Sequence, residues 1–385
     1  MKTRFSLIVA ALMVAGNASA ATVNLSSAYW VQYGDAQSYS LPIAGVNLQS
    51  SPGQIQDLIV VATGAEGNPV TTNSSGMDNA YSSPNSPPAQ TNPQDTFFTA
   101  NILTSRGTTG TVNNNLDNTW DASLGAMKSF LKGDAMTVFF NNNQINSGGG
   151  SLQSLASWAR LWITDASGSL VTMNGLNGNS GYFYLTNLGA KYDIVTQGGG
   201  GVFLGDVTTY SSSVANPFAG DKNGTDFVLS GGKICTLTIS GIPTPVPCGT
   251  PGSTSTDHNL GADRAAYALI FPELNAMMNT LFGSLSASDL DKYTLHADIR
   301  LGCGFKPVIA QGNKLVYDFG ANDESWGMAC MYDNTYGNGL NNGYEQIFIG
   351  TATLRNQVPE PATGMLLGLS LIALMASSRR NQSRH

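Results

Sequence analysis

The stretch LHADIRLGC at residues 295–303 indicates most clearly which class of fold the chain adopts. Apolar and polar residues alternate along it, and in a β-strand every second side chain lies on the same face. One face carries Leu295, Ala297, Ile299 and Leu301, and the other carries His296, Asp298 and Arg300. Such alternation is typical of an antiparallel strand with one face on a core and the other in water. We therefore expect the three polar side chains to be exposed.

Short apolar runs separated by Gly, Asn, Ser and Pro continue on both sides of this stretch. Runs of this length between turn-forming residues are typical of an all-β sandwich or barrel. A turn at residues 165–169 is expected to close a hairpin, and the proline-rich residues 68–94 are expected to form an exposed loop. The other expected strands cover residues 23–27, 55–62, 136–140, 158–164, 181–185, 227–229, 235–239, 266–271, 314–319 and 344–354.

Two stretches have the spacing of an amphipathic helix instead. The first begins near Pro272, a residue suited to the first helical position, and the second ends before Gly133. Their apolar stripes are Leu274, Met277, Met278, Leu281, Phe282 and Leu285 in the first, and Trp120, Leu124, Met127 and Leu131 in the second. We therefore predict a mainly β, antiparallel, sandwich-like ectodomain with two or so short covering helices.

The composition limits the class of partner. The 385 residues include 18 Lys and Arg against 25 Asp and Glu, a formal net charge of −7. Only 11% of the residues are charged, less than half of the roughly 25% usual in globular domains. Several of the basic residues lie near the two ends, so the region between them is more acidic still. An acidic protein repels phosphate backbones, which argues against nucleic acid as a partner.

The first twenty residues have the parts of a secretory signal peptide. A basic start precedes the apolar residues 5–16, and small residues surround the cleavage expected between Ala20 and Ala21. A permanent membrane anchor is disfavoured because the apolar run is too short to cross a bilayer core of about 30 Å. We expect residues 1–20 to direct export.

Residues 358–385 combine a short motif, an apolar stretch and a basic pair. The motif Val358-Pro359-Glu360-Pro361 precedes the almost uncharged residues 362–378, and Arg379-Arg380 follows. A helix of that length measures roughly 25 Å, which can span a bilayer when the arginines snorkel. Arginines after the stretch favour a cytoplasmic position for that end. We therefore expect residues 21–357 to be exported and held by one transmembrane helix.

The order of these parts resembles the PEP-CTERM sorting signal of Gram-negative bacteria. The resemblance implies that an exosortase recognises the segment and that the inner-membrane anchor is transient. It also implies delivery to the cell surface or extracellular matrix, where such proteins accompany exopolysaccharide in biofilms or flocs. Residues 260–275, 300–304 and 341–350 are similar to a group of exported PEP-CTERM proteins of undefined activity, which implies a common β-rich ectodomain.

The exported region, residues 21–357, is long enough to bury a core of its own. The glycine-rich residues 197–201 allow a boundary between two domains near residue 200. We favour a single β-rich ectodomain.

All four cysteines, Cys235, Cys248, Cys303 and Cys330, lie in the exported region. An even number of cysteines in an oxidising compartment predicts two disulfides. Of the three possible pairings, the simplest joins sequence neighbours, Cys235 with Cys248 and Cys303 with Cys330. A metal site made of four thiolates is disfavoured because no pair has the C-x2-C spacing.

Few residues point to catalysis or to a cofactor. The histidines are His258, His296 and His385, and His258 lies in the polar stretch 252–261 without a serine-hydrolase motif nearby. Residues 221–226 have part of the spacing of a calcium loop, although a plain turn explains them better. We therefore expect no catalytic residue, no cofactor and no metal.

Two groups of side chains are weak ligand candidates. His296, Asp298 and Arg300 could bind an anionic sugar or perform acid–base chemistry, although a solvent-facing strand is the simpler explanation. The second group, whose rings could hold a sugar or belong to the core, consists of Trp158, Arg160 and Trp162 with Tyr182 and Tyr184 on a later strand.

These observations leave three classes of function. The favoured one is a structural or adhesive surface protein in an exopolysaccharide context, with exosortase as processing enzyme. The alternative is a glycan-binding module, which clustering of Trp158, Trp162 and Tyr182 in one groove would favour. A secreted hydrolase is the least favoured, because it needs paired carboxylates in a cleft.

Overall fold

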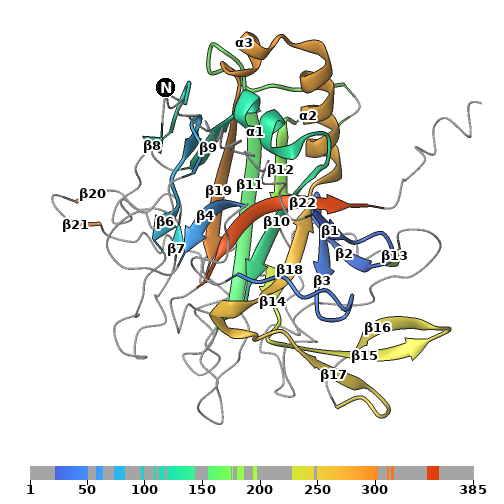
Figure 1. Ribbon diagram of the computed structural model, residues 1–385. Coiled ribbons are helices and arrows are strands. Elements are labelled where there is room, and N and C mark those ends of the chain that lie inside the picture. Colours follow the sequence, from blue (N-terminus) through green and yellow to red (C-terminus); the bar gives the residue numbers. More distant parts are fainter. Residues whose placement is uncertain are drawn as a thin grey trace, which may run out of the picture.

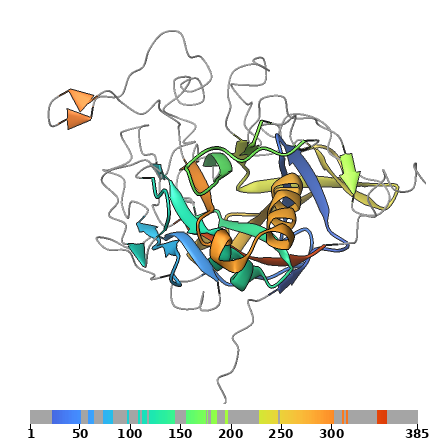
Figure 2. The same ribbon diagram turned by 90° about the horizontal axis from the view of Figure 1, so that it is seen from above.

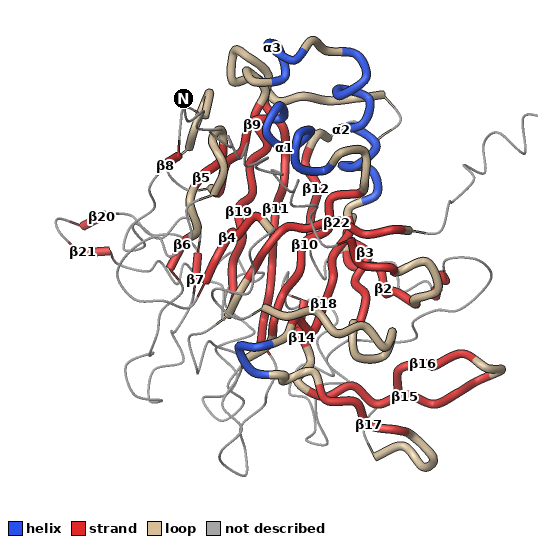
Figure 3. The backbone as a smooth tube through the Cα atoms, viewed as in Figure 1, coloured by secondary structure: helices blue, strands red, loops and turns tan. Residues whose placement is uncertain are grey.

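The computed structural model describes residues 22–50, 58–63, 73–82, 97–98, 108–109, 112–116, 119–143, 155–174, 176, 180–185, 194–196, 228–246, 249–301, 310–311, 314–315 and 345–354. These residues are mainly β, as Figures 1 and 3 show, which confirms the predicted class. The segments expected to be the signal peptide and the transmembrane helix lie outside them.

The larger of two main sheets has nine strands among the described residues, in the order β13-β2-β3-β18-β10-β22-β4-β6, with β1 beside β22. Neighbours are antiparallel except for two parallel pairs, β1 with β22 and β4 with β6. We call it the first sheet. Its strands are β1 (Thr22–Asn24), β2 (Tyr29–Tyr33), β3 (Ala36–Ser40), β4 (Ile59–Thr63), β6 (Tyr81–Ser82), β10 (Ala135–Asn141), β13 (Ile194–Thr196), β18 (Ala265–Ile270) and β22 (Ile347–Thr353).

The second sheet has the order β12-β11-β19-β9-β5-β8, with β14 beside β11 and β7 beside β19. At its centre β11 and β19 pair in antiparallel register from Ser157 with Leu301 to Thr164 with Thr294. The strand expected from LHADIRLGC is therefore confirmed as β19. The strands are β5 (Met77–Asp78), β7 (Phe97–Phe98), β8 (Thr108–Thr109), β9 (Trp120–Ser123), β11 (Leu155–Thr164), β12 (Tyr182–Leu185), β14 (Val228–Ser230) and β19 (Thr294–Leu301).

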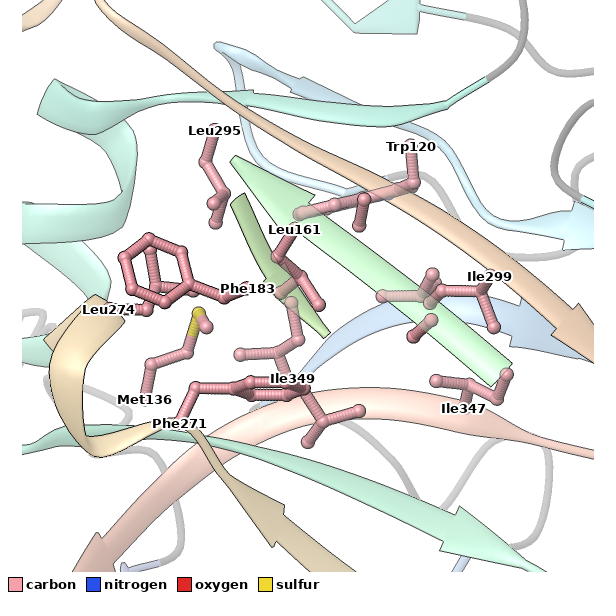
Figure 4. Close-up of a cluster of buried hydrophobic side chains, with 14 of the residues drawn as sticks. Trp120, Met136, Leu161, Phe183, Phe271, Leu274, Leu295, Ile299, Ile347 and Ile349 are labelled. Carbon is pink, nitrogen blue, oxygen red and sulfur yellow. The ribbon is translucent and has the colours of Figure 1, made fainter. Parts of the chain in front are cut away.

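One hydrophobic cluster takes side chains from both sheets. Leu161 and Leu295 come from the second sheet, and Ile347 and Ile349 come from the first; all four are nearly inaccessible to solvent. Figure 4 shows these side chains pointing toward one another between the strands. A core shared by two open sheets is in keeping with the predicted sandwich-like arrangement.

Strands from both sides of residue 200 alternate within each sheet. In the first sheet β18 lies between β3 and β10, and in the second sheet β19 lies between β11 and β9. The described strands before and after residue 200 therefore bury their apolar faces in one common core.

The first sheet is also covered on its outer face. Tyr39, Phe139 and Phe348 belong to a second cluster there, and the two phenylalanine rings stack with their centroids 5.4 Å apart. Strands buried on both faces read as continuous apolar runs rather than as alternating ones. This explains the unbroken run Ile59–Thr63 in β4, where every residue is buried.

Three α-helices of the described residues gather at one end of the strands, and the view from above in Figure 2 shows them lying over the strand ends. They are α1 (Leu124–Leu131), α2 (Pro272–Ser284) and α3 (Ala287–Leu290). Pro272 occupies the start of α2 as predicted, and the buried stripe includes Leu274 and Met278. Helix α1 ends at Leu131, and the residue that caps it, Lys132, has a left-handed backbone directly before Gly133.

Trp120 was expected on the stripe of the second helix, and that expectation is wrong. It lies in β9, where its ring is fully buried and its Nε1 donates to the Asp78 carbonyl oxygen at 3.2 Å. The helix begins only after Ser123, whose side chain accepts from the backbone N–H of Ala126. Trp120 and Leu124 thus share a spacing of four residues without sharing a helix.

The predicted turn at residues 165–169 is confirmed. Asp165 N–H donates to the Ser169 carbonyl oxygen, and Gly168 N–H donates to the Asp165 carbonyl oxygen. The Asp165 carboxylate accepts hydrogen bonds from Ser167 and from the Ser169 backbone, which lowers the pKa of Asp165. The returning chain makes only an isolated bridge from Leu170 to Thr164, and β12 pairs with β11 instead.

A three-stranded sheet projects from the opposite end of the molecule to the helices (Figure 1). It consists of β16 (Ile242–Val246), β15 (Lys233–Ile239) and β17 (Thr254–Asp257), and a separate two-stranded pair joins β20 (Ala310–Gln311) and β21 (Lys314–Leu315). Pro243 and Pro245 lie in the edge strand β16, where proline is tolerated.

Cys235 on β15 is buried and disulfide-bonded. Its Cα partner across the hairpin is Val246, two residues before Cys248. Cys248, Cys303 and Cys330 lie outside the described residues, so both predicted pairings stay predictions.

Residues 68–94 were expected to form an exposed loop, and within the described residues 73–82 this is wrong for Asn73 and for residues 77–81, which are buried. Asn73 is buried and takes the place of a strand partner: its Oδ1 accepts from Val60 N–H, and its Nδ2 donates to the carbonyl oxygens of Val60 and Asp78. A polar side chain can satisfy backbone groups in this way, so polar composition alone does not indicate exposure.

Candidate functional site

The weak ligand candidates come together on the outer face of the second sheet. Register places Tyr182, Trp162, His296 and Asp121 in one row across four strands. A second row contains Tyr184, Arg160 and Asp298. Trp158 on β11 pairs with Arg300 on β19, one row beyond Arg160 and Asp298. The Arg300 side chain is not among the described side chains. We call these two rows the polar–aromatic face.

The expectation that His296 and Asp298 face water is wrong. Their exposed fractions are 0% and 1%. The Trp162 ring stacks on the His296 ring with centroids 5.1 Å apart, so the neighbouring aromatic shields the imidazole. Alternation along β19 gives the correct faces, but it does not reveal that other side chains cover the polar one.

His296 belongs to a buried hydrogen-bond network. Its Nδ1 donates to Asp121 Oδ1 at 2.8 Å, and its Nε2 lies 2.8 Å from Thr164 Oγ1. The Asp121 carboxylate also accepts from Thr119 Oγ1 and from Leu116 N–H, each at 2.6 Å. Every oxygen of this carboxylate therefore has a donor, as a buried charge requires.

Asp298 is buried beside the one basic side chain of its row. Arg160 Nη2 lies 3.7 Å from Asp298 Oδ2. The same guanidinium lies over two rings, 4.8 Å from the Trp162 centroid and 5.4 Å from the Tyr182 centroid. Arg160 thus couples the buried carboxylate to the aromatic side chains by an ion pair and by cation–π contacts.

The aromatic side chains differ in exposure. Trp158 and Trp162 are buried, whereas Tyr182 and Tyr184 on the end strand β12 are half-buried. The two tyrosine rings lie 6.4 Å apart, and each contacts one of the tryptophans. The tryptophans therefore support the face, and the tyrosines with Arg160 form its accessible edge, which we call the tyrosine edge.

Sequence reasoning missed a second buried histidine. His258 was placed in a polar loop, but its exposed fraction is 0% and its ring stacks on Tyr267 with centroids 5.1 Å apart. Its Nδ1 donates to the Thr256 carbonyl oxygen, so its Nε2 accepts from Ser40 Oγ at 2.6 Å. Burial lowers the pKa of His258 to about 4. The polar neighbours in sequence gave no signal of this environment.

Burial also raises the pKa of Tyr267, whose hydroxyl donates to the Gly231 carbonyl oxygen. Within the described residues, no three His, Cys, Asp or Glu side chains are arranged to hold a metal ion. The partial calcium loop at residues 221–226 lies outside these residues. In the same part of the chain, no helix has the length and apolar character needed to cross a bilayer.

Comparison with protein families gives two matches. The family described as "Domain of unknown function (DUF8239)" matches residues 23–300, well over half of the chain. The PEP-CTERM protein-sorting motif matches residues 357–380, which confirms the resemblance seen at Pro359-Glu360-Pro361 and marks the chain as an exosortase substrate. The motif implies export and a transient C-terminal membrane anchor. No curated protein and no solved structure matches the chain.

Proposed function

We propose that this chain is a noncatalytic adhesive protein of the exopolysaccharide matrix. The chain belongs to the family described as "Domain of unknown function (DUF8239)" and carries an exosortase sorting motif. It reaches that matrix after exosortase has removed the membrane anchor. The ectodomain then acts by binding rather than by chemistry, and it needs neither a cofactor nor a metal.

The arrangement that most resembles a catalytic triad is buried, which supports a noncatalytic role. Asp121, His296 and Thr164 follow the hydrogen-bond order of a catalytic triad. Their exposed fractions are 0%, 0% and 7%, so a substrate cannot reach the threonine hydroxyl or the imidazole. Such a network instead fixes β9, β11 and β19 relative to one another.

The tyrosine edge is the observation that carries the proposal of matrix binding. Tyr182 and Tyr184 offer two half-buried rings on an end strand, and the half-buried Arg160 side chain, 32% exposed, lies beside them. Flat rings next to a charged hydrogen-bond donor suit the apolar faces and the hydroxyl or carboxylate groups of sugars. Because the tryptophans beneath are packed in place, the rings are held without a large loss of side-chain entropy on binding.

A double substitution tests this role. The Tyr182→Ala/Tyr184→Ala protein should be exported and sorted normally, and its retention on purified matrix polysaccharide should fall about tenfold or more. The matched control is Tyr29→Ala, which removes a half-buried strand tyrosine from the first sheet. Equal retention of both proteins would exclude the tyrosine edge as the binding surface.

A second comparison separates sorting from binding. Replacement of Pro359, Glu360 and Pro361 by alanine should leave export intact and trap the uncleaved protein in the inner membrane. Normal release of that variant would show that delivery does not depend on the motif. Release of sugar fragments or peptides from the matrix by wild-type protein would overturn the noncatalytic proposal.

A further inference from the structure

An apolar cavity of about 110 Å³ lies between the two main sheets, at the end where the three-stranded sheet packs. The first sheet contributes Val31 and Leu269 to its wall, and the second sheet contributes Leu185 and Val228. Ile234 and Pro245, from the three-stranded sheet, also line the cavity. The cavity is therefore built by three sheets and not by one loop.

A second cavity of about 50 Å³ adjoins the first and extends into the centre of the core. Ser157, Leu185 and Leu269 line both, so the two spaces share a wall. Figure 4 labels Leu161, Phe271, Leu295, Ile299, Ile347 and Ile349, which line the inner cavity. For scale, an engineered apolar cavity of about 150 Å³ holds one benzene molecule.

The shared wall contains a buried hydroxyl without a hydrogen bond. Ser157 is 7% exposed, and its Oγ has no partner among the described residues. Three other hydroxyls of the lining are engaged: Ser230 Oγ donates to the Leu155 carbonyl oxygen, Ser40 Oγ to His258, and Tyr267 to the Gly231 carbonyl oxygen. A buried unpaired hydroxyl costs free energy that an acceptor from a ligand would recover.

The described lining of both cavities carries no Lys, Arg, Asp or Glu side chain. His258, which contacts Ser40 at the wall, is neutral near pH 7 because burial holds its pKa at about 4. A charged head group would therefore lose its hydration without meeting an opposite charge. The chemistry favours a neutral ligand over a carboxylate or an ammonium ion.

We propose that these adjoining cavities bind a small, neutral, apolar molecule with a hydrogen-bond-accepting oxygen, such as a short alkyl ester. The oxygen accepts from Ser157 Oγ, and apolar arms fill the space on both sides. This binding is separate from the tyrosine edge, which lies on the outer face of the second sheet.

Two probes with the same short alkyl chain test the proposal: methyl butanoate and butanoate, titrated by calorimetry into the exported protein purified without detergent. Methyl butanoate should bind saturably at one site, and butanoate should bind at least tenfold more weakly. Ser157→Ala should weaken ester binding roughly three- to tenfold through loss of one hydrogen bond. Ser284→Ala on α2, outside both cavities, should leave it unchanged.

Val31→Trp, which fills the outer cavity, should abolish ester binding while the melting curve stays cooperative. If the Val31→Trp protein does not fold, the Ser157→Ala protein decides whether the cavities bind the ester. The Ser157 hydroxyl has no hydrogen bond to lose, so the melting temperature of the Ser157→Ala protein should not fall. Absence of saturable ester binding, equal binding of butanoate, or unchanged affinity in Ser157→Ala would overturn the proposal. Unchanged ester binding by the Tyr182→Ala/Tyr184→Ala protein separates this result from the matrix proposal.

Discussion

The two buried histidines are built alike and differ in one partner. His258 and His296 are both fully buried, each stacks on an aromatic ring at 5.1 Å, and each has a hydroxyl at Nε2. The Nδ1 of His258 donates to a backbone carbonyl oxygen, whereas the Nδ1 of His296 donates to the Asp121 carboxylate. A single exchange of partner therefore separates a neutral histidine site from one that contains a buried charge.

That difference determines what each site can tolerate. Around His258 all hydrogen-bond partners are neutral, so loss of one partner removes one ordinary hydrogen bond. Around His296 the carboxylate needs all of its donors, because an uncompensated charge in the interior is far more costly than an unpaired neutral group. Equal burial of the two histidines therefore does not mean an equal contribution to the free energy of unfolding.

The largest effect should come from removal of the carboxylate. Asp121→Ala takes away the acceptor of His296, Thr119 and Leu116 at once and should lower the free energy of unfolding by about 3–5 kcal/mol. Urea denaturation followed by circular dichroism measures this loss. Asp121→Asn, which keeps the shape and one acceptor, should lose less. A loss below about 1 kcal/mol for Asp121→Ala would contradict the distinction between the two sites.

The second effect is a dependence on pH that belongs to His258. Its pKa is about 4 in the folded chain against 6.5 as the ordinary value. The unfolded chain therefore binds a proton as the pH falls through 6.5, while the folded chain does so only near pH 4. The contribution of His258 to the free energy of unfolding is complete above pH 6.5, and it should fall by about 3 kcal/mol as the pH decreases to 4.

Unfolding measured at pH 7 and at pH 4.5 checks this sign and size. The control is His258→Gln, in which stability should change less over the same range. If the substituted protein lost as much stability as the wild type between these pH values, the effect would have to come from other groups.

Removing the hydroxyl of Ser40 or of Thr164 compares the energy of the hydrogen bond at Nε2 in the two histidine sites. Ser40→Ala leaves His258 Nε2 and Ile43 N–H without their partner, and should cost about 2–3 kcal/mol. Thr164→Val keeps the shape of the side chain and removes one hydrogen bond from His296, which should cost about 1–2 kcal/mol. The reverse order, measured by urea denaturation, would mean that the threonine does more than complete the network.

Substitution of an exposed carboxylate should change the free energy of unfolding least, and it serves as the baseline for the other substitutions. Asp289 accepts from Lys292 and Ser286, and the Lys292 hydrogen bond lowers its pKa most strongly. Because the pair is solvated and screened, Asp289→Asn should leave the urea midpoint unchanged within error. A shift as large as that of Asp121→Ala would mean that burial does not separate the two carboxylates.

Much of the secondary structure could be predicted because it depends on local pattern. The alternation in β19, the turn at residues 165–169 and the stripe of α2 each follow from a period in the sequence. The failures have local causes too. Trp120 matched a helical spacing by coincidence. Residues 73–82, of which Asn73 and residues 77–81 are buried, were too polar in composition to be recognised as part of a sheet.

The sequence predicted which residues belong to the candidate site, but it did not predict what surrounds them. Trp158, Arg160, Trp162, His296 and Asp298 do share one face. No pattern within β11 or β19 could show that Asp121 completes the row or that Trp162 shields the imidazole, because these partners lie more than a hundred residues from His296.

A sorting motif and a hydrophobic period each involve only a few neighbouring residues, so the sequence alone indicates the sorting of the chain and most of its strands and helices. Which polar groups are buried, which hydroxyl near the cavities lacks a partner, and which rings remain accessible depend on the tertiary structure. Burial is a property of what covers a residue, and for His258, His296 and Ser157 the covering groups come from distant parts of the chain.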